Sequence, residues 1–415
     1  MMQLSWVDFD RLEQEYGESF FIVDICQFKQ NYTEFIQAFR SIYANTNLGY
    51  SYKTNYLPKL CQTAAELGGY AEVVSQMEYD LAIAIGVPPH RIIFNGPLKH
   101  QADLEAAILA GAIVNLDSLE EAELVAALAK RLPAQQIAVG LRCNFNLGDD
   151  RISRFGLDVE AGDLDRIFQK FGELPNCQVD GLHCHFTTAA RSIASYALRT
   201  KKILEISDRY FPDRPPKFID VGGGFFGKMT ADLQEQFDCH IPNYQEYATA
   251  IATQLQNRFP DANSRPELII EPGVAIIADV LIFACKVVGL KTVRSRQIAL
   301  VVGSFQNVKP TMTDKNLAIK VYRNMENTQQ RKLSGTIDIV GYTCMETDCL
   351  YKDYQGEVGI GDYIVFENMG AYTIVFKQPF IRPNPPIISY DSNLDEYSLV
   401  RRAETAKDIF ATYVI

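Results

Sequence analysis

Lys53 is the first residue along the chain whose position suggests chemistry. It ends the aromatic run Tyr50-Ser51-Tyr52-Lys53, and a helical pattern begins soon afterwards at Leu60. A lysine amine at the end of a strand can attack a carbonyl group and form a covalent bond with it. Most lysines at such positions are simply solvated. A chemical role for Lys53 therefore depends on the motifs that follow it.

The run Gly222-Gly223-Gly224 is the second such feature. It follows the apolar stretch Phe218 to Val221. Residues without Cβ let backbone N–H groups approach an anion closely, as they do in phosphate-binding loops. A tight turn is the alternative, but it would need only one or two glycines. The run therefore favours a phosphate site.

Glu271 follows the apolar run Leu268 to Ile270, so we expect its carboxylate to be partly buried. A buried carboxylate is costly unless it is paired. Its partner could be a neighbouring arginine or the protonated ring nitrogen of a cofactor. The choice between the two depends on what else lies nearby.

His183 and His185 flank Cys184, and alternate residues of a strand share a face. Zinc would need a third ligand, for which the surrounding sequence offers no recognisable partner pair, so we predict no metal site. We expect one histidine to stack on an aromatic ligand and the other to pack in the wall. Together with the lysine, the glycine run and the carboxylate, these residues describe a pyridoxal phosphate site.

Short apolar runs alternate with helix-length segments through most of the chain. The runs are 50–53, 71–75, 91–95, 112–117, 137–143, 179–185, 218–221 and 268–271. Eight such units predict a parallel sheet covered by helices, and their number favours a closed (β/α)8 TIM barrel over residues 28–275. An open doubly wound sheet is the alternative. In a barrel, Lys53, His185 and Glu271 would meet where the strands end.

Beyond about Ile276 the pattern changes to alternating apolar and polar residues separated by Gly, Asn and Asp. This is typical of antiparallel strands. We expect strands at 280–288, 298–302, 336–340, 362–366 and 372–376. Residues 276–415, joined by 1–27 through a strand near Phe20 to Asp24, are predicted to form a mainly antiparallel β domain.

Composition limits the classes of function. A net charge of −11 over 415 residues, with no cluster of Lys and Arg, argues against a nucleic-acid partner. No segment has the length of a membrane span, and the start has no leader pattern. Nine cysteines at irregular spacing do not form a disulfide framework. We expect a cytoplasmic protein that acts on a small molecule, without a membrane partner.

The motifs resemble those of the fold type III pyridoxal-phosphate amino-acid decarboxylases, which include diaminopimelate, ornithine and arginine decarboxylases and have an alanine racemase-like barrel. The resemblance extends from about Phe20 to Phe380. It is carried by Tyr50-Ser51-Tyr52-Lys53-Thr54-Asn55, Asn115-Leu116-Asp117-Ser118, Ser153-Arg154-Phe155-Gly156, Gly181-Leu182-His183-Cys184-His185, Asp220 to Gly224, Glu271-Pro272-Gly273, Gly341 to Asp348 and Gly370-Ala371-Tyr372-Thr373.

The resemblance implies a role for each matching residue. Lys53 would hold the cofactor covalently, His185 would stack on its ring, and Glu271 would keep its ring nitrogen protonated. The other cofactor-binding residues implied are Arg142, Thr188, Gly222, Gly223, Gly224, Gly273 and Tyr372. Cys344 would enter the partner subunit's site and donate a proton to the substrate's Cα. The implied protein is a homodimeric carboxy-lyase of amino-acid metabolism with shared active sites.

Several positions depart from the family's pattern. Val274 stands where the family usually carries an arginine, and Thr187 where a glycine is usual. Met345 occupies the position of the acidic residue that usually binds the substrate's distal amine, and Glu346 is one place later. Lys309-Pro310 occupies the position of an arginine-proline pair. A distal ammonium buried without a carboxylate would be costly. The substrate is therefore predicted to be a modified or conjugated basic amino acid.

The residues proposed to contact this substrate are Cys344, Met345, Glu346, Asp348 and Lys309. Two other classes of function stay open at this point. A racemase of the same fold would exchange the Cα proton without releasing carbon dioxide. A decarboxylase-like regulator without activity would be expected to lose Lys53 or Cys344, and both are present.

Overall fold

The computed structural model describes residues 4–148, 152–186, 188, 191–311, 313, 315–324, 331–376 and 378–414. Thr187, one of the departures noted above, lies outside these residues. The chain divides into two compact units. One comprises 31–226 and 239–275, and the other comprises 1–30, 227–238 and 276–415.

The first unit is a closed barrel of parallel strands. They are β2 (Thr46–Ser51), β3 (Tyr70–Val73), β4 (Ile92–Phe94), β5 (Ile113–Leu116), β6 (Ile137–Asn144), β8 (Cys177–His183), β9 (Phe218–Asp220) and β10 (Glu267–Ile270). Each strand pairs with its neighbour in the chain, β10 pairs with β2, and β5 pairs with β6, so the ring is complete. The predicted (β/α)8 barrel is confirmed, and the open sheet is not what forms.

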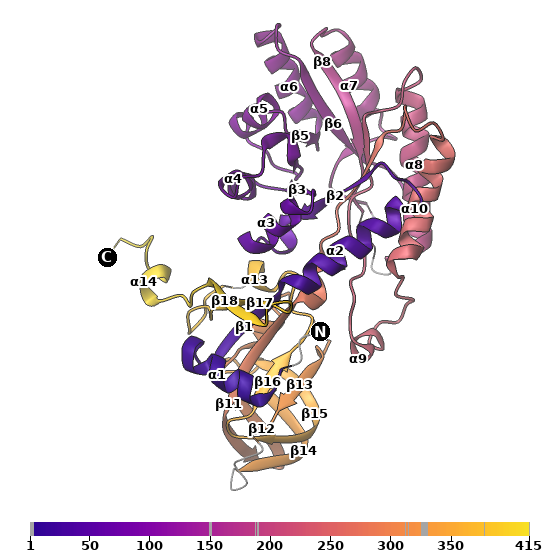
Figure 1. The fold of residues 1–415 in the computed structure, drawn as a ribbon. Helices are drawn as coiled ribbons and strands as arrows, with labels where there is room; N and C mark the ends of the chain where they lie inside the picture. Colours follow the sequence, from indigo (N-terminus) through magenta and orange to yellow (C-terminus); the bar gives the residue numbers. More distant parts are fainter. Residues whose placement is uncertain are drawn as a thin grey trace. The chain divides into compact units, whose positions relative to one another are not determined.

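Helices lie outside the strands of the barrel (Figure 1). They include α3 (Pro58–Glu66), α4 (Gln76–Ala84), α5 (Gln101–Leu109), α6 (Leu119–Arg131), α7 (Asp163–Gly172), α8 (Ile193–Tyr210) and α10 (Tyr244–Arg258). Ser75 caps α4 by accepting a hydrogen bond from the N–H of Glu78 at 3.3 Å, and Ser118 caps α6 in the same way. These caps fix the first residues of the helices that follow β3 and β5.

Most of the barrel strands end one or two residues earlier than the apolar runs suggested. β2 ends at Ser51, so Lys53 lies in a short 3₁₀ turn, η1 (Tyr52–Thr54). β8 ends at His183 and β10 at Ile270, so His185 and Glu271 lie just beyond their strands. The barrel interior below them is filled by Tyr70, Ile93, Phe218 and Ile269. The functional side chains therefore lie in the first turn above a packed core.

The second unit is built on a mainly antiparallel sheet. Its strands are β1 (Ser19–Asp24), β11 (Leu281–Val293), β12 (Arg296–Val301), β13 (Ile319–Tyr322), β14 (Lys332–Val340), β15 (Cys349–Gly359), β16 (Tyr363–Phe366), β17 (Ile387–Asp391) and β18 (Glu396–Arg401). β1 pairs antiparallel with β11 and parallel with β17. The N-terminal strand thus joins this sheet, as the sequence predicts.

Helices complete both units. They are α1 (Trp6–Tyr16), α2 (Ile25–Arg40), α9 (Ala231–Gln234), α11 (Val274–Ile277), α12 (Phe305–Val308), α13 (Thr373–Phe376) and α14 (Ala406–Ile409). In α1, Phe9 and Leu12 pack with Phe20, Ile22 and other buried residues of the sheet. That contact gives the second unit a core of its own.

The predicted strand at 372–376 is wrong, because this segment forms α13. Tyr372 has a positive φ of 63°, which turns the chain out of the extended conformation. The N–H of Phe376 then donates to the carbonyl of Tyr372 at 3.2 Å. A run as short and apolar as this fits either a strand or one helical turn, and here the turn at Tyr372 decides.

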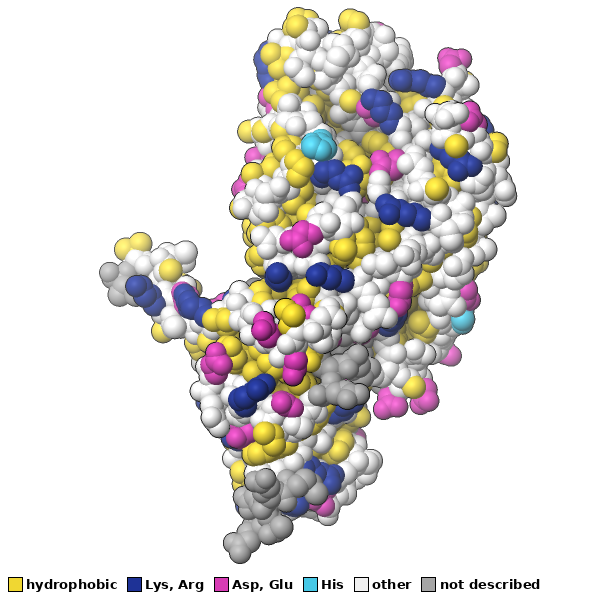
Figure 2. Space-filling model, viewed as in Figure 1, with side chains coloured by type: hydrophobic (Ala, Val, Ile, Leu, Met, Phe, Trp, Pro, Cys, Tyr) yellow, Lys and Arg dark blue, Asp and Glu magenta, His cyan; other side chains and the backbone are white. Residues whose placement is uncertain are grey.

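Charges of both signs are interspersed on the face in view, where Lys and Arg do not gather into one patch (Figure 2). This agrees with the absence of a basic cluster in the sequence. Among the described residues, no helix combines the length and apolar composition needed to cross a bilayer.

Candidate active site

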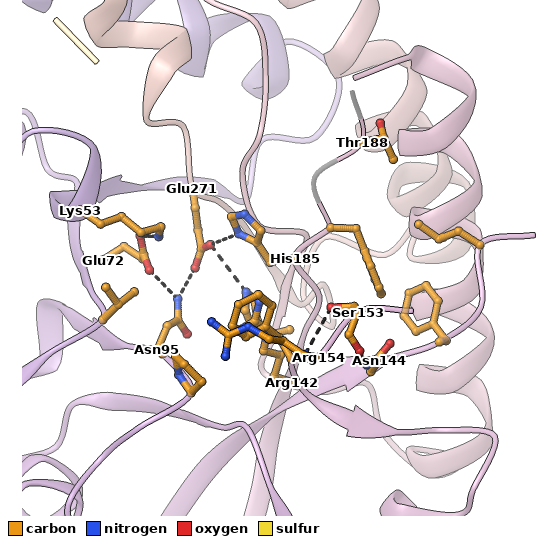
Figure 3. A pocket seen from close by; sticks show the side chains of 18 of the residues that line it. Lys53, Glu72, Asn95, Arg142, Asn144, Ser153, Arg154, His185, Thr188 and Glu271 are labelled. Atoms are coloured by element: carbon orange, nitrogen blue, oxygen red, sulfur yellow. Dashed lines mark hydrogen bonds and ion pairs between the residues drawn. The ribbon is translucent and has the colours of Figure 1, made fainter. Parts of the chain in front are cut away.

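A cavity of about 490 Å³ opens in the barrel unit beyond the carboxyl ends of the strands. Lys53, Arg142, His185, Thr188 and Glu271 all line it (Figure 3). Lys53 follows β2, Arg142 lies near the end of β6, His185 and Thr188 follow β8, and Glu271 follows β10. The barrel therefore brings together predicted residues that are as far apart in the chain as Lys53 and Glu271.

Lys53 reaches the cavity with its amine, and 30% of its side chain is exposed. Nζ lies 2.5 Å from Glu72 Oε2 and 2.9 Å from Ser51 Oγ. Glu72 itself is fully buried at the end of β3. An ion pair to a buried carboxylate holds the amine in one place while leaving it open to the cavity.

Asn95 connects this pair to Glu271. Its Nδ2 donates to Glu72 Oε1 at 3.0 Å and to Glu271 Oε1 at 2.5 Å. Figure 3 shows Lys53, Glu72 and Asn95 on one side of Glu271 and His185 on the other. A single hydrogen-bonded network thus extends from the lysine to the histidine.

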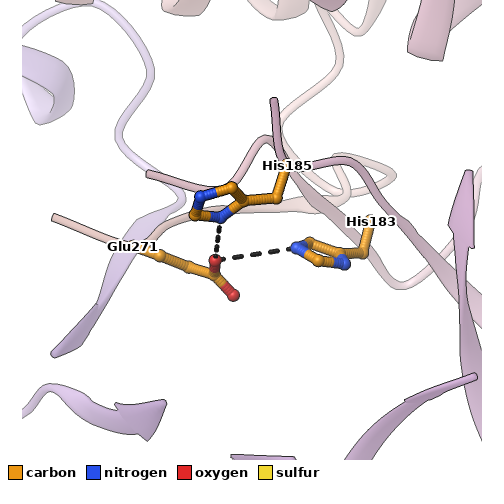
Figure 4. Close-up of side chains that lie close together, drawn as sticks. All are labelled: His183, His185 and Glu271. Atoms are coloured by element: carbon orange, nitrogen blue, oxygen red, sulfur yellow. Dashed lines mark hydrogen bonds and ion pairs between the residues drawn. The ribbon is translucent and has the colours of Figure 1, made fainter. Parts of the chain in front are cut away.

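Two histidines face the second oxygen of Glu271 (Figure 4). His185 Nδ1 lies 3.1 Å from Glu271 Oε2, and His183 Nε2 lies 3.6 Å from the same atom. The N–H of Gly223 also points at His185 Nδ1, at 3.3 Å. A neutral ring nitrogen can donate to Glu271 or accept from Gly223 but cannot do both, so the tautomer of His185 decides which bond forms.

The surroundings keep Glu271 ionised. Burial by itself would raise the pKa of Glu271, but the neighbouring ring of His183, the hydrogen bond of His185 and the charge of Lys53 outweigh it and hold the pKa well below its usual range. Burial lowers the pKa of His185 to about 4, against the opposing attraction of Glu271. At neutral pH, the site therefore presents a carboxylate beside a neutral imidazole.

Asp220 is the second carboxyl group beneath Glu271. It ends β9, is fully buried, and accepts the N–H of Gly222 at 2.8 Å. Burial, together with the negative charge of Glu271, raises its pKa well above the usual range. Two neighbouring carboxyl groups cannot both ionise in such a place at low cost. The negative charge is thus concentrated on Glu271.

The glycine run passes close to both groups. Gly222 has φ +68°, which favours glycine, and a Cβ there would lie 2.6 Å from the carbonyl oxygen of Cys184. A Cβ on Gly223 would lie 2.2 Å from the carbonyl oxygen of Glu271. The backbone can approach the floor of the cavity this closely only without side chains. Gly224 continues the run with φ +90°.

The remaining predicted residues of the barrel take distinct places. Arg142 Nη1 bonds to Asp117 Oδ1 at 2.8 Å. Thr188 Oγ1 accepts the N–H of Arg191 at 3.1 Å. A Cβ on Gly273 would lie 2.1 Å from Thr54 Oγ1, so this glycine lets the loop of Glu271 pack against the turn of Lys53. Val274 opens α11.

The other predicted residues belong to the second unit. Cys344 and Met345 are exposed, as is Glu346, in the loop between β14 and β15. Asp348 accepts the N–H groups of Phe305 and Thr343 at 2.7 and 2.9 Å, so it anchors that loop. Lys309 is buried, with Nζ 3.4 Å from Asn316 Oδ1. Tyr372 precedes α13 and stacks on Phe376.

Sequence reasoning missed Glu72 and Asn95. Glu72 stands inside the apolar run Tyr70-Ala71-Glu72-Val73-Val74, and a charged residue in a buried strand is itself a sign of function. Asn95 ends its run and gives no comparable sign. The third metal ligand thought to be missing also exists, since donor atoms of His183, His185 and Glu271 all lie within 4.8 Å of one another.

Comparison with known proteins decides how this cavity is interpreted. Residues 29–278 match the family model described as "Pyridoxal-dependent decarboxylase, pyridoxal binding domain". The chain belongs to this family. It is a pyridoxal-phosphate-dependent carboxy-lyase that acts on an amino acid. The alternatives of a racemase and of an inactive regulator are thereby set aside.

The curated relatives are similar over nearly their whole length. Diaminopimelate decarboxylase of Bacillus subtilis is 26% identical, covering 98% of this chain and 94% of the relative. That of Methanocaldococcus jannaschii is 25% identical over 97% and 93%. The crystal structure of the latter enzyme superposes with a TM-score of 0.85 at 24% identity, covering 98% of this chain and 94% of that chain. This last likeness concerns the fold.

The residues fit pyridoxal phosphate. The cavity holds an amine that can bond to a carbonyl carbon, and an ionised, buried carboxylate that can face a ring nitrogen. Gly222 and Gly223 have no room for Cβ atoms, and a loop of this kind suits a phosphate group. His185, neutral and at the cavity wall, can pack its ring on an aromatic face. These are the groups that the cofactor requires.

Replacing His185 by glutamine is expected to flatten the loss of stability in acid. The folded chain binds the His185 proton only near pH 4, whereas an unfolded histidine binds it near about 6.5. Between these values the unfolded chain holds more protons, so stability falls as pH falls, by up to about 1.4 kcal/mol per pH unit from this group. Urea unfolding of the cofactor-free chain from pH 7 to 5 measures the slope.

The exposed His90, in η2 (Pro89–Arg91), supplies the control for this measurement. His90→Gln should leave the slope of the wild type unchanged. An equal slope for His185→Gln and the wild type would show that His185 is not held neutral in the fold.

Proposed function

We propose that the protein removes the α-carboxylate of an amino acid whose side chain is modified or conjugated. The observation that carries this proposal is the outer part of the cavity. There the wall is formed by Phe145, Leu147, Ile152, Phe155 and Phe186, with Arg154 among them. Such a wall suits an extended, partly apolar side chain.

The charges in the cavity support the same substrate. Among the described residues that line it, Glu72 and Glu271 are the carboxylates, and both already hold hydrogen bonds. The guanidinium of Arg154 lies 4.1 Å from the centre of the Phe155 ring and pairs with no carboxylate in the described part of the chain. A free distal ammonium would therefore meet a cation, while a distal anion would find a partner.

The residues have separable tasks in this reaction. When bound, pyridoxal phosphate supplies an electron-withdrawing ring that accepts the electron pair left by carbon dioxide. Lys53 would hold the cofactor covalently through its amine. Glu271, held ionised, would keep a proton on the cofactor's ring nitrogen. Cys344 delivers a proton to Cα, and we propose that it comes from the partner subunit of a homodimer.

Diaminopimelate is the second candidate. It is favoured by the relatives, which are named as diaminopimelate decarboxylases, and by its distal carboxylate, which Arg154 could bind. Against it stands Met345, which offers no negative charge to the distal ammonium. The two candidates differ in whether that ammonium is free.

A carbon dioxide release assay separates them. We expect turnover of diamino acids whose distal nitrogen carries a carboxyalkyl or acyl group, and little turnover of lysine, ornithine or diaminopimelate. High turnover of diaminopimelate or ornithine would refute the proposal. We place this reaction in the cytoplasm, in keeping with the nine unpaired cysteines.

Arg154→Ala is expected to raise KM for a substrate ending in a carboxylate by about 10- to 100-fold, because a hydrogen bond to a charged group is lost. The value of kcat should change little, since Arg154 is proposed to contact the distal end of the substrate and not its Cα. Arg166→Ala removes an exposed arginine of α7 and is the matched control. An unchanged KM for Arg154→Ala would remove the distal anion from the proposal.

A further inference from the structure

Asn95 occupies an unusual position between two buried carboxylates. It follows β4, and 3% of its surface is exposed. One N–H of its amide points to Glu72 and the other to Glu271. A primary amide offers two donors from a single atom without adding a charge. An aliphatic side chain or a carboxylate at this position could not join the two groups.

Asn115 fixes the direction of that amide. Its Nδ2 donates to Asn95 Oδ1 at 2.8 Å, so the oxygen of Asn95 is turned away from the carboxylates and both of its N–H groups are turned towards them. Asn115 is itself buried, at the end of β5. A reversed Asn95 amide would place its oxygen against two carboxylates, which is costly in a buried site.

Each carboxylate serves a different end of the site. Glu72 holds the amine of Lys53, and Glu271 faces the histidines. The titratable groups around the two carboxylates are Lys53, Glu78, His183, His185 and Asp220. Two like charges in one wall raise each other's affinity for protons unless a donor lies between them. Asn95 is that donor.

We propose that Asn95 is a positioning residue that couples the Lys53–Glu72 pair to Glu271, so that both ends of the site keep their charges together. The protein would thereby hold the amine that bonds the cofactor and the carboxylate that holds its ring nitrogen as one unit. A change in the charge of the Lys53–Glu72 pair would therefore alter the pKa of Glu271 through the neutral amide of Asn95.

The test measures the two ends separately. In the cofactor-free full-length chain, the rate of Lys53 acetylation by acetic anhydride against pH, followed by mass spectrometry, reports the Lys53 end. In the holoenzyme loaded with cofactor that is ¹⁵N-labelled at its ring nitrogen, the ¹⁵N chemical shift against pH reports the Glu271 end. Asn95→Leu is expected to move both titrations to higher pH, by about one unit at Glu271, because a charge-assisted hydrogen bond is lost.

Two variants act on one end only. Ser51→Ala removes a hydroxyl that contacts Lys53 and Glu72, and it should move the acetylation curve alone. His183→Phe removes a ring that faces Glu271, and it should move the ¹⁵N curve alone. Movement of one curve or of neither in Asn95→Leu, with its melting temperature near that of the wild type, would overturn the proposal. If Asn95→Leu does not fold, Asn95→Ser carries the same test.

Discussion

Lys53→Ala is expected to lower the rate of carbon dioxide release by at least about 10³-fold, because it removes both the covalent partner of the cofactor and a proton carrier. Among the described residues that line the cavity, Lys53 is the lysine, and Glu72 holds its amine there. Borohydride reduction of the wild-type holoenzyme should leave the cofactor attached to Lys53. Mass spectrometry of the peptide that contains residue 53 is the measurement.

Lys99, in the same unit, is the alternative candidate for the lysine that bonds the cofactor. Its side chain is fully buried, its amine lies 3.0 Å from Glu121 Oε2, and burial lowers its pKa. A lysine with a lowered pKa is a common choice for bonding a carbonyl group. If reduction attached the cofactor to Lys99, or if Lys53→Ala kept its activity, the assignment of Lys53 would be wrong. Lys59→Ala, on α3, should behave as the wild type.

The barrel could be predicted because short segments of the sequence are enough to indicate its strands and helices. Its strands are buried on both faces, so their sequences are apolar throughout, and the helices between them carry their own caps at Ser75 and Ser118. Parallel strands place all their carboxyl ends together. Lys53, His185 and Glu271 could therefore be brought to one cavity from the order of the motifs alone.

The hydrogen-bond network could not be predicted in the same way. Whether Asn95 reaches Glu72 or Glu271 depends on the stagger of β3, β4 and β10 and on side-chain torsions, and neither is encoded locally. The same holds for His183, which was expected to pack in the wall and does so, but with Nε2 3.6 Å from Glu271. Partners across a barrel are set by register, which the sequence pattern leaves open.

The second unit was predicted less well than the barrel. Strands were expected where apolar and polar residues alternate, yet 372–376 forms a helical turn and the strands β13, β15, β17 and β18 were not foreseen. Short half-exposed strands have weak patterns, and their pairing partners lie far apart in the chain, as β1 and β17 do. Long-range pairing decides such a sheet, and it cannot be read from one segment.

A mixture of Lys53→Ala and Cys344→Ala chains is expected to recover activity that neither variant has. Cys344 lies exposed on the β14–β15 loop of the second unit, and we propose that it acts in the site of a partner subunit. After random exchange, half of the dimers are hybrids, and each hybrid has one of its two sites intact. The mixture should therefore reach about a quarter of wild-type activity.

The size of the recovery distinguishes the arrangements. If each subunit supplied its own Lys53 and Cys344, every site in every hybrid would carry one lesion, and mixing would recover nothing. Subunit exchange must be verified by native mass spectrometry of differently tagged chains, so that a lack of recovery has one meaning. Cys239→Ala, which alters a partly exposed thiol of the barrel unit, should keep full activity and show that loss in Cys344→Ala arises from the proton it delivers.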